Sequence, residues 1–189
     1  MFHLSLLWHY NSFLASSGKD RSLCVFKVVK QVDKIFASPF FTVKKAHKRI
    51  IWDCSWFHND HIVTVSRDGT CKIWKINDSS NDADCLCIAE FTPFEKTPVT
   101  AVDVNFQIMD RVIIALGGED GRLAIWEANF PTVDNQVSIS FVAEADLSFC
   151  HGLSIKRLKW NPNSKNNDFL LASVGEDHTV RIYRFNYNC

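Results

Sequence analysis

The sequence has no excess of charge of either sign and no long apolar run. Its 189 residues carry 21 basic and 21 acidic side chains, and 47% of them are apolar, a composition that suits one soluble globular domain. No apolar run approaches the roughly 18–20 residues that cross a bilayer, and polar side chains interrupt the longest uncharged stretch, residues 1–18. We therefore expect no contact with a membrane.

The sequence also lacks a basic leader and a disulfide framework. No Lys or Arg precedes Lys19, so residues 1–18 lack the charged start of a secretory signal peptide. The seven cysteines are odd in number and scattered along the chain, which is typical of reduced, buried thiols in an intracellular protein. We expect a reducing compartment.

Sequence signatures of catalysis are missing. The chain has no glycine-framed nucleophile elbow, no phosphate-cradling loop, no dinucleotide fingerprint and no cysteine trio of a radical iron–sulfur enzyme. We therefore expect no enzyme activity, no cofactor, no metal and no small-molecule substrate.

Four related segments repeat along the chain. Each places an aspartate six residues before an aromatic residue, and the aspartates are 48, 52 and 57 residues apart. The pairs are Asp20 with Phe26, Asp68 with Trp74, Asp120 with Trp126, and Asp177 with Tyr183. This period is slightly longer than the roughly 40–45 residues of a four-stranded propeller blade, so the repeat predicts radially arranged sheets.

Short apolar and alternating runs around each aspartate predict strands. Asp-Gly pairs between them predict tight hairpin turns, because such turns need positive backbone angles. We predict four strands in each of the first three units and three in the last, 15 in all. The units span about residues 1–43, 44–92, 93–143 and 144–189.

The second unit resembles a WD repeat of the β-propeller family, through Ala46-His47, Trp56, Thr64, Asp68 and Trp74. The resemblance implies a buried tetrad in which the Trp74 indole reaches the Thr64 hydroxyl, Thr64 reaches His47, and Asp68 holds His47. This pattern is structural. It implies an all-β, WD-repeat propeller of four blades in an incomplete ring of seven-bladed design.

The other units depart from this pattern. The first has Ser16, Asp20 and Phe26, but we expect it to start too late to supply the tetrad histidine. The third has Asp120 and Trp126 but Leu116 in place of a hydroxyl. In the fourth unit, His151, Ser173 and Asp177 are followed by Tyr183 in place of a tryptophan. We expect these blades to depend more on packing than on hydrogen bonds.

Two stretches, residues 46–56 and 172–184, resemble the final blades of the family of the second Elongator subunit. The resemblance implies a non-catalytic scaffold that contacts the largest and the catalytic subunits of the complex that modifies wobble uridines of tRNA. It implies a cytoplasmic and also nuclear location. A generic WD-repeat adaptor and an RNA-contacting propeller remain the alternatives.

The first unit begins at once with an inner strand, and the last offers no fourth strand. A propeller hides its strand edges by closing its ring. We therefore expect this chain to be a fragment that needs further blades.

Three side-chain groups suggest chemistry but have simpler explanations. His47, Thr64 and Asp68, like the matching set in the fourth unit, recur in register with the blades and are expected to be buried. His58 and His61 lie between two strands, where we expect a solvated loop rather than a metal site. Cys85 and Cys87 alternate along a strand, so we expect them to pack on one face.

The charges are unevenly distributed along the chain. Residues 19–49 contain nine basic residues against two acidic ones, and residues 78–120 contain nine acidic against two basic. Because successive blades occupy successive sectors of a ring, one sector should attract anions and the next should repel them. The candidate partner-binding residues are Lys19, Lys44, Lys45, Lys48, Arg49 and Arg67. An acidic protein is the favoured partner, a weak tRNA contact is the alternative, and a merely solvated surface remains open.

Overall fold

The computed structural model describes residues 5–8, 13–31, 34–58, 60–79, 82–108, 111–130, 137–163 and 168–186. Within these residues the chain is built of strands and one short 3₁₀ turn, Leu147–Phe149. No helix in this part of the chain is long and apolar enough to span a bilayer. The all-β prediction is confirmed.

The strands form four antiparallel sheets, which we call blades 1 to 4 in chain order. Blade 1 contains β1 (Ser5–Trp8), β2 (Phe13–Ser17), β3 (Leu23–Gln31) and β4 (Lys34–Val43). Blade 2 contains β5 (Ile51–Phe57), β6 (His61–Ser66), β7 (Cys71–Ser79) and β8 (Asp82–Phe91). Blade 3 contains β9 (Val99–Ile108), β10 (Arg111–Gly118), β11 (Leu123–Asn129) and β12 (Ser138–Glu144). Blade 4 contains β13 (Ile155–Trp160), β14 (Asp168–Gly175) and β15 (Val180–Asn186).

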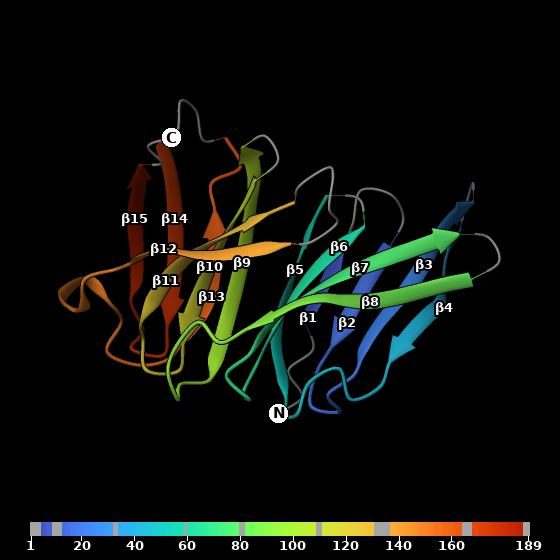
Figure 1. The fold of residues 1–189 in the computed structure, drawn as a ribbon, viewed down its shortest axis with the longest axis horizontal. Coiled ribbons are helices and arrows are strands. Elements are labelled where there is room, and N and C mark those ends of the chain that lie inside the picture. The colour runs from blue at the N-terminus through green and yellow to red at the C-terminus, as the bar shows by residue number, and fades with distance from the viewer. Residues whose placement is uncertain are drawn as a thin grey trace.

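The four blades follow one another in an arc, from β1–β4 at one end to β13–β15 at the other (Figure 1). The first strands of the blades, β1, β5, β9 and β13, are neighbours in chain order. Three apolar clusters fill the spaces between successive blades, so each blade buries a face against the next. The arc is an incomplete propeller ring, as the repeat predicts.

Every turn aspartate is followed by a residue in the left-handed region. Gly69 and Gly121 have φ values of 84° and 87°, and Arg21 and His178 have 66° and 59°. The Asp-Gly prediction therefore applies to blades 2 and 3. Blades 1 and 4 build the same turn with side chains that disfavour this conformation.

Two buried aspartates link the inner strands of neighbouring blades. The carboxylate of Asp53 on β5 accepts a hydrogen bond from the backbone N–H of Val102 on β9 at 3.3 Å. The carboxylate of Asp103 on β9 accepts one from the backbone N–H of Trp160 on β13 at 2.7 Å, and its other oxygen lies 2.8 Å from the Lys159 ammonium. These links hold each inner strand against the next.

The last strand of the described chain, β15, hydrogen-bonds to β14 alone within the described residues. Val180 and Ile182 are 68% and 65% exposed, and Leu170 and Val174 of β14 are also exposed. Blade 4 thus presents an apolar face to solvent.

Candidate interaction surface

In blade 2 the four tetrad residues form one chain of hydrogen bonds. The indole N–H of Trp74 donates to the Thr64 hydroxyl oxygen at 2.8 Å, and His47 Nε2 lies 2.7 Å from the same oxygen. His47 Nδ1 lies 3.3 Å from the Asp68 carboxylate, which also accepts from the backbone N–H of Lys48 at 2.8 Å. This network thereby holds the loop before β5 against the β6–β7 turn.

The Asp68 carboxylate is strongly engaged in this network. Burial would raise its pKa, but hydrogen bonds from His47 and Thr70 outweigh burial and hold the pKa of Asp68 well below its ordinary value of 3.8. The folded blade therefore favours the ionised form of this carboxylate.

Blade 4 repeats the network without a tryptophan. His151 Nε2 lies 2.6 Å from the Ser173 hydroxyl, and His151 Nδ1 lies 2.9 Å from the Asp177 carboxylate. The Tyr183 hydroxyl donates to the carbonyl of Phe149 at 2.8 Å. The aromatic member of this blade therefore holds the 3₁₀ turn.

In blade 3 a hydrogen-bonded group of Asp120, Arg122 and Thr97, nearer the surface, takes the place of the tetrad. The Asp120 carboxylate accepts hydrogen bonds from Arg122 Nε at 2.7 Å and from the Thr97 hydroxyl at 3.1 Å. The Trp126 indole nitrogen is buried and has no hydrogen-bond partner within the part of the chain that the structure describes. Its ring packs between Phe91 and Phe141, with centroids 4.9 and 5.6 Å away.

In blade 1, Asp20 accepts a hydrogen bond from the backbone N–H of Ser22 at 3.2 Å and so shapes the turn after β2. Ser16 lies on β2, opposite Cys24 of β3. The first blade thus retains the turn aspartate of the repeat.

The two triad-like sets are placed for structure. The Thr64 and Ser173 side chains are fully or almost fully buried, and each hydroxyl already contacts a buried histidine. A nucleophile must reach its substrate, and these hydroxyls lie inside their blades.

His61 differs from its prediction as part of a solvated loop. Its side chain begins β6, is 8% exposed and stacks on Phe57 with ring centroids 5.1 Å apart. His61 Nδ1 lies 2.6 Å from the Asp60 carboxylate. Burial lowers the pKa of His61 more than Asp60 raises it. The solvated-loop prediction is wrong for His61, because Phe57 and Phe130 cover it, but the side chain of His58 is exposed.

Cys85 and Cys87 lie on β8, opposite Ile76 and Trp74 of β7. Burial raises the pKa of Cys85 to about 12 and also raises the pKa of Cys87. Neither cysteine favours the thiolate that redox chemistry requires.

The predicted basic residues lie on three loops at one end of blades 1 and 2. These loops are the β2–β3 turn, the β4–β5 connection and the β6–β7 turn. Backbone hydrogen bonds join them: Ile51 N–H donates to the Gly18 carbonyl at 3.2 Å, and Arg67 N–H donates to the Ile50 carbonyl at 2.9 Å. The three loops therefore form one continuous surface.

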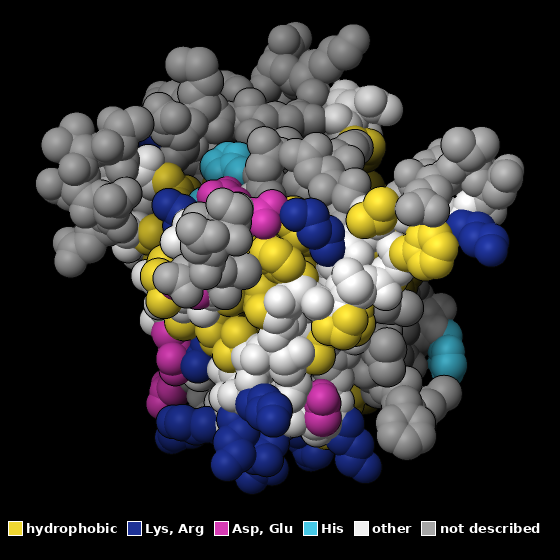
Figure 2. Space-filling model, turned by 90° about the vertical axis from the view of Figure 1, so that its right-hand side faces the viewer, with side chains coloured by type: hydrophobic (Ala, Val, Ile, Leu, Met, Phe, Trp, Pro, Cys, Tyr) yellow, Lys and Arg dark blue, Asp and Glu magenta, His cyan; other side chains and the backbone are white. Residues whose placement is uncertain are grey.

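We call this surface the basic end. Its side chains are all exposed, and within the described part of the chain they form no ion pair. They are Lys19, Arg21, Lys44, Lys45, Lys48, Arg49 and Arg67. Figure 2 shows Lys and Arg side chains gathered along the lower edge of the blade 1 flank, with an apolar band above them. Arg21 is an addition to the predicted set, supplied by the same turn as Lys19.

The matching loops of blades 3 and 4 carry the opposite charge, and we call them the acidic end. Their exposed or half-buried carboxylates are Glu95, Glu119, Asp120, Asp146, Glu176 and Asp177. Glu119 and Glu176 donate backbone N–H groups to the carbonyls of Pro98 and Ser154, as Arg67 does in blade 2. The charge pattern along the sequence thus becomes a pattern around one face.

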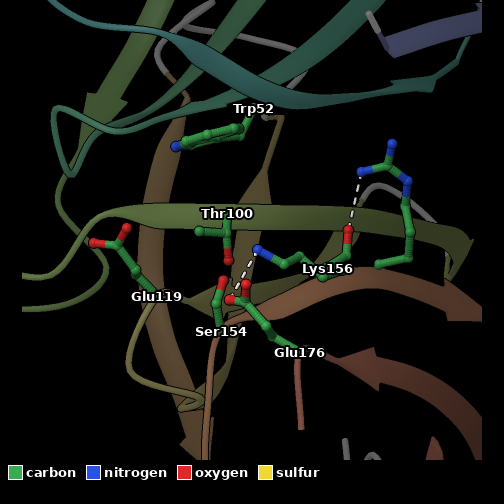
Figure 3. A pocket seen from close by; sticks show the side chains of 7 residues that line it. Trp52, Thr100, Glu119, Ser154, Lys156 and Glu176 are labelled. Carbon is green, nitrogen blue, oxygen red and sulfur yellow. Dashed lines mark hydrogen bonds and ion pairs between the residues drawn. The ribbon is translucent and has the colours of Figure 1, made fainter. Parts of the chain in front are cut away.

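A cavity of about 220 Å³ lies between residues of the inner strands β5, β9 and β13, beside turn residues of the acidic end. Its walls are formed by Trp52, Thr100, Glu119, Ser154, Lys156, Arg157 and Glu176. In Figure 3 the Trp52 indole lies across the cavity from Thr100 and Ser154, and the Glu119 carboxylate stands apart from the ion pair between Lys156 and Glu176. This ion pair measures 3.1 Å.

The sequence interpretation did not anticipate this cavity. Lys156 and Arg157 belong to β13, whose alternation with buried Ile155 and Leu158 predicts a strand but not the residues it will face. The one available signal was the charge of the residue before each turn aspartate, which is basic in blades 1 and 2 and acidic in blades 3 and 4.

Comparison with known proteins places these features in a family. The repeat described as "WD domain, G-beta repeat" matches residues 38–75 and 146–184. Elongator complex protein 2 of Arabidopsis thaliana is 32% identical to this chain over 190 residues, covering 94% of this chain and 22% of that protein. The Schizosaccharomyces pombe protein of the same name is 30% identical and covers 90% of this chain and 21% of its own length. The mouse protein is 31% identical and covers 93% and 24%.

A solved structure, that of Saccharomyces cerevisiae Sqt1, superposes on 95% of this chain and 43% of its own with a TM-score of 0.64. At 15% identity, this likeness shows the fold alone. The chain spans about a fifth of the length of the curated relatives. It contains WD repeats arranged as blades of an incomplete β-propeller and is homologous to a part of Elongator complex protein 2.

Proposed function

We propose that the chain serves as part of a non-catalytic scaffold in Elongator, supporting assembly of the complex that modifies wobble uridines of tRNA. The observation that carries this proposal is the similarity to Elongator complex protein 2 along at least 90% of the chain in two relatives. The proposed partners are the largest subunit and the catalytic subunit, and the proposed location is the cytoplasm and the nucleus.

The placement of the polar residues supports a scaffold. The histidine–hydroxyl–aspartate sets hold loops to blades, and the buried aspartates of β5 and β9 hold blades to each other. These groups stabilise surfaces rather than present reactive atoms. The Asp68 and Asp177 carboxylates accept hydrogen bonds from the backbone N–H groups of Lys48 and Gly152, and so hold loops of the basic and acidic ends in place.

The basic end supports docking of an acidic protein segment. Its seven cations are exposed, lie on loops joined by backbone hydrogen bonds, and form no ion pair within the described residues. Such a surface attracts an acidic partner and increases its association rate at low salt. We propose Lys44, Lys45, Lys48 and Arg49 as its centre.

Co-purification tests the scaffold. The tagged chain, expressed in cells that contain Elongator, should recover the largest and catalytic subunits, and a variant with Lys44, Lys45, Lys48 and Arg49 all replaced by Glu should recover several-fold less. The double variant Lys48→Glu with Arg49→Glu has a matched control, Lys34→Glu with Lys96→Glu, which reverses two exposed lysines outside the basic end and should leave recovery unchanged. Recovery of other complexes without any Elongator subunit would favour a generic adaptor instead.

Direct RNA contact is the second candidate, because the same exposed cations could neutralise phosphates. Binding to tRNA that weakens steeply as salt rises from 50 to about 200 mM, and that is lost on reversal of Lys48 and Arg49, would support it. Recovery of protein partners that survives nuclease treatment, together with weak tRNA binding that the reversal leaves unchanged, would support protein docking.

A further inference from the structure

The cavity between the inner strands has the size of a site for one side chain. Its volume is about 220 Å³, below the roughly 300–1,000 Å³ of pockets that hold small-molecule ligands and cofactors. Its walls include Glu119 and Glu176 from the turns of blades 3 and 4, so a segment lying on those turns could insert one residue.

The charges in its walls are not equally available. Lys156 already pairs with Glu176 at 3.1 Å. Arg157 donates from Nη1 to the Lys156 carbonyl at 2.9 Å, and the same atom lies 4.0 Å from the buried Asp53 carboxylate. Both cations therefore have anionic or carbonyl partners.

Glu119 differs from the other charged groups in the wall. It is exposed, and within the described part of the chain its carboxylate forms no ion pair and no hydrogen bond. Its backbone is fixed by the bond from its N–H to the Pro98 carbonyl at 3.0 Å. A carboxylate on a fixed backbone, with no partner of its own, is available to a cation from outside.

The other walls suit the same ligand. The Trp52 indole presents an aromatic surface, on which a guanidinium or ammonium group is attracted by the ring quadrupole. The Thr100 hydroxyl donates to the Ile155 carbonyl at 2.7 Å, which leaves its oxygen lone pairs as acceptors for an N–H donor. An arginine side chain matches an aromatic face, a carboxylate and hydroxyl acceptors together.

We infer that this cavity receives an arginine side chain from a protein partner, with Glu119 as its counter-ion and the Trp52 indole against its guanidinium plane. The inference deepens the proposed docking function and rests on it for the existence of a protein partner. It also gives the face two complementary parts: the basic end takes acidic residues, and the cavity takes a basic one.

A peptide experiment on the full chain tests the site without any Elongator subunit. The probe is acetyl-Gly-Arg-Gly amide, and the neutral, nearly isosteric control is the same peptide with citrulline in place of arginine. Indole N–H resonances of the ¹⁵N-tryptophan-labelled chain are followed by NMR during titration, and the Trp52→Phe variant assigns the Trp52 signal. The arginine peptide should shift the Trp52 resonance, and the citrulline peptide should not.

Variants sharpen the result. Glu119→Gln should weaken arginine-peptide binding about ten-fold, the effect of losing one charge-assisted contact. Glu95→Gln removes an exposed carboxylate of the acidic end that does not line the cavity, and it should change nothing. Lys156→Met should strengthen binding, because it frees the Glu176 carboxylate and removes a positive charge from the wall.

Three outcomes would overturn the inference: equal shifts with the citrulline peptide, unchanged affinity in Glu119→Gln, or a Trp52 shift produced by inorganic phosphate instead of arginine. The last would assign the cavity to an anion held by Lys156 and Arg157. If the arginine peptide binds but co-purification fails, the arginine site stands and the Elongator scaffold proposal is wrong. If co-purification succeeds but the peptide does not bind, the scaffold proposal stands and the arginine site is wrong.

Discussion

In blade 2 the Trp74 indole donates a hydrogen bond to Thr64 at 2.8 Å, whereas in blade 3 the Trp126 indole nitrogen is buried without a partner among the described residues. The hydroxyl of blade 2 is replaced in blade 3 by Leu116, whose side chain is fully buried. Both blades nevertheless form four-stranded sheets with the same strand order. The tetrad is therefore one of two ways to fill the same space.

The two blades differ in the contacts that hold the turn after their second strand. Blade 2 ties its turn to its own preceding loop through His47 and Asp68. Blade 3 has no histidine in its network, and its turn packs closely against the loop that leads into blade 4: a Cβ at Gly121 would lie 2.0 Å from the His151 carbonyl oxygen. The turn of blade 2 is thus held by hydrogen bonds to its own preceding loop, and the turn of blade 3 depends in addition on close contact with the loop before β13.

The largest expected loss of stability follows from adding a side chain at Gly121, beside the His151 carbonyl. Gly121→Ala should lower the free energy of unfolding by about 3 kcal/mol, because the positive φ costs roughly 1–2 kcal/mol for a residue with a Cβ and the His151 carbonyl must also move. Gly69→Ala is the matched control in blade 2, since it has a similar φ of 84° but its Cβ would meet the Thr97 carbonyl oxygen at 3.4 Å. It should cost about 1 kcal/mol. Urea unfolding measures both, and equal costs would contradict the role assigned to the blade 4 contact.

A smaller effect is expected from the turn aspartates. Asp68→Asn should cost about 2 kcal/mol at pH 7, because it weakens bonds to a charged acceptor inside the blade. Asp120→Asn should cost less than about 1 kcal/mol, because the Asp120–Arg122 pair is partly exposed to solvent. Both costs are measured by urea unfolding at the same salt concentration.

The effect of pH on the free energy of unfolding tests whether the charge of Asp68 stabilises blade 2. The pKa of Asp68 is lowered in the folded chain, since hydrogen bonds from His47 and Thr70 outweigh the effect of burial. Its contribution is therefore present above the unfolded pKa near 3.8 and is lost as the pH falls below that value. The difference in stability between the native chain and Asp68→Asn should shrink between pH 5 and pH 3. A difference that stays constant across this range would show that the carboxylate charge does not stabilise blade 2.

The strands and the turn aspartates could be predicted from the sequence because both are local. Alternating apolar residues fix which face of a strand is buried, and the distance from Asp68 to Trp74 is set by one hairpin. The tetrad of blade 2 was implied by the resemblance of that unit to a WD repeat, in which each partner occupies a fixed place.

The remaining features depend on partners far away in the sequence. Alternation along β13 does not show that Lys159 will meet Asp103, 56 residues earlier. Thr97 and Arg122 replace the missing histidine of blade 3 without matching the repeat. Arg21 and His178 adopt the left-handed conformation that Asp-Gly pairs would have indicated. The cavity needs three inner strands at once, so no single stretch of sequence contains it.

The smallest expected effect compares the two tryptophans directly. Trp74→Phe removes the indole donor to Thr64, whereas Trp126→Phe removes a buried donor that has no partner among the described residues. Both changes lose similar apolar area, so the loss in unfolding free energy should be about 1 kcal/mol larger for Trp74→Phe, the typical net value of one hydrogen bond. Chemical denaturation of both variants under one set of conditions gives this difference. If Trp126→Phe cost as much as Trp74→Phe, the hydrogen bond of blade 2 would add nothing beyond the packing that already suffices in blade 3.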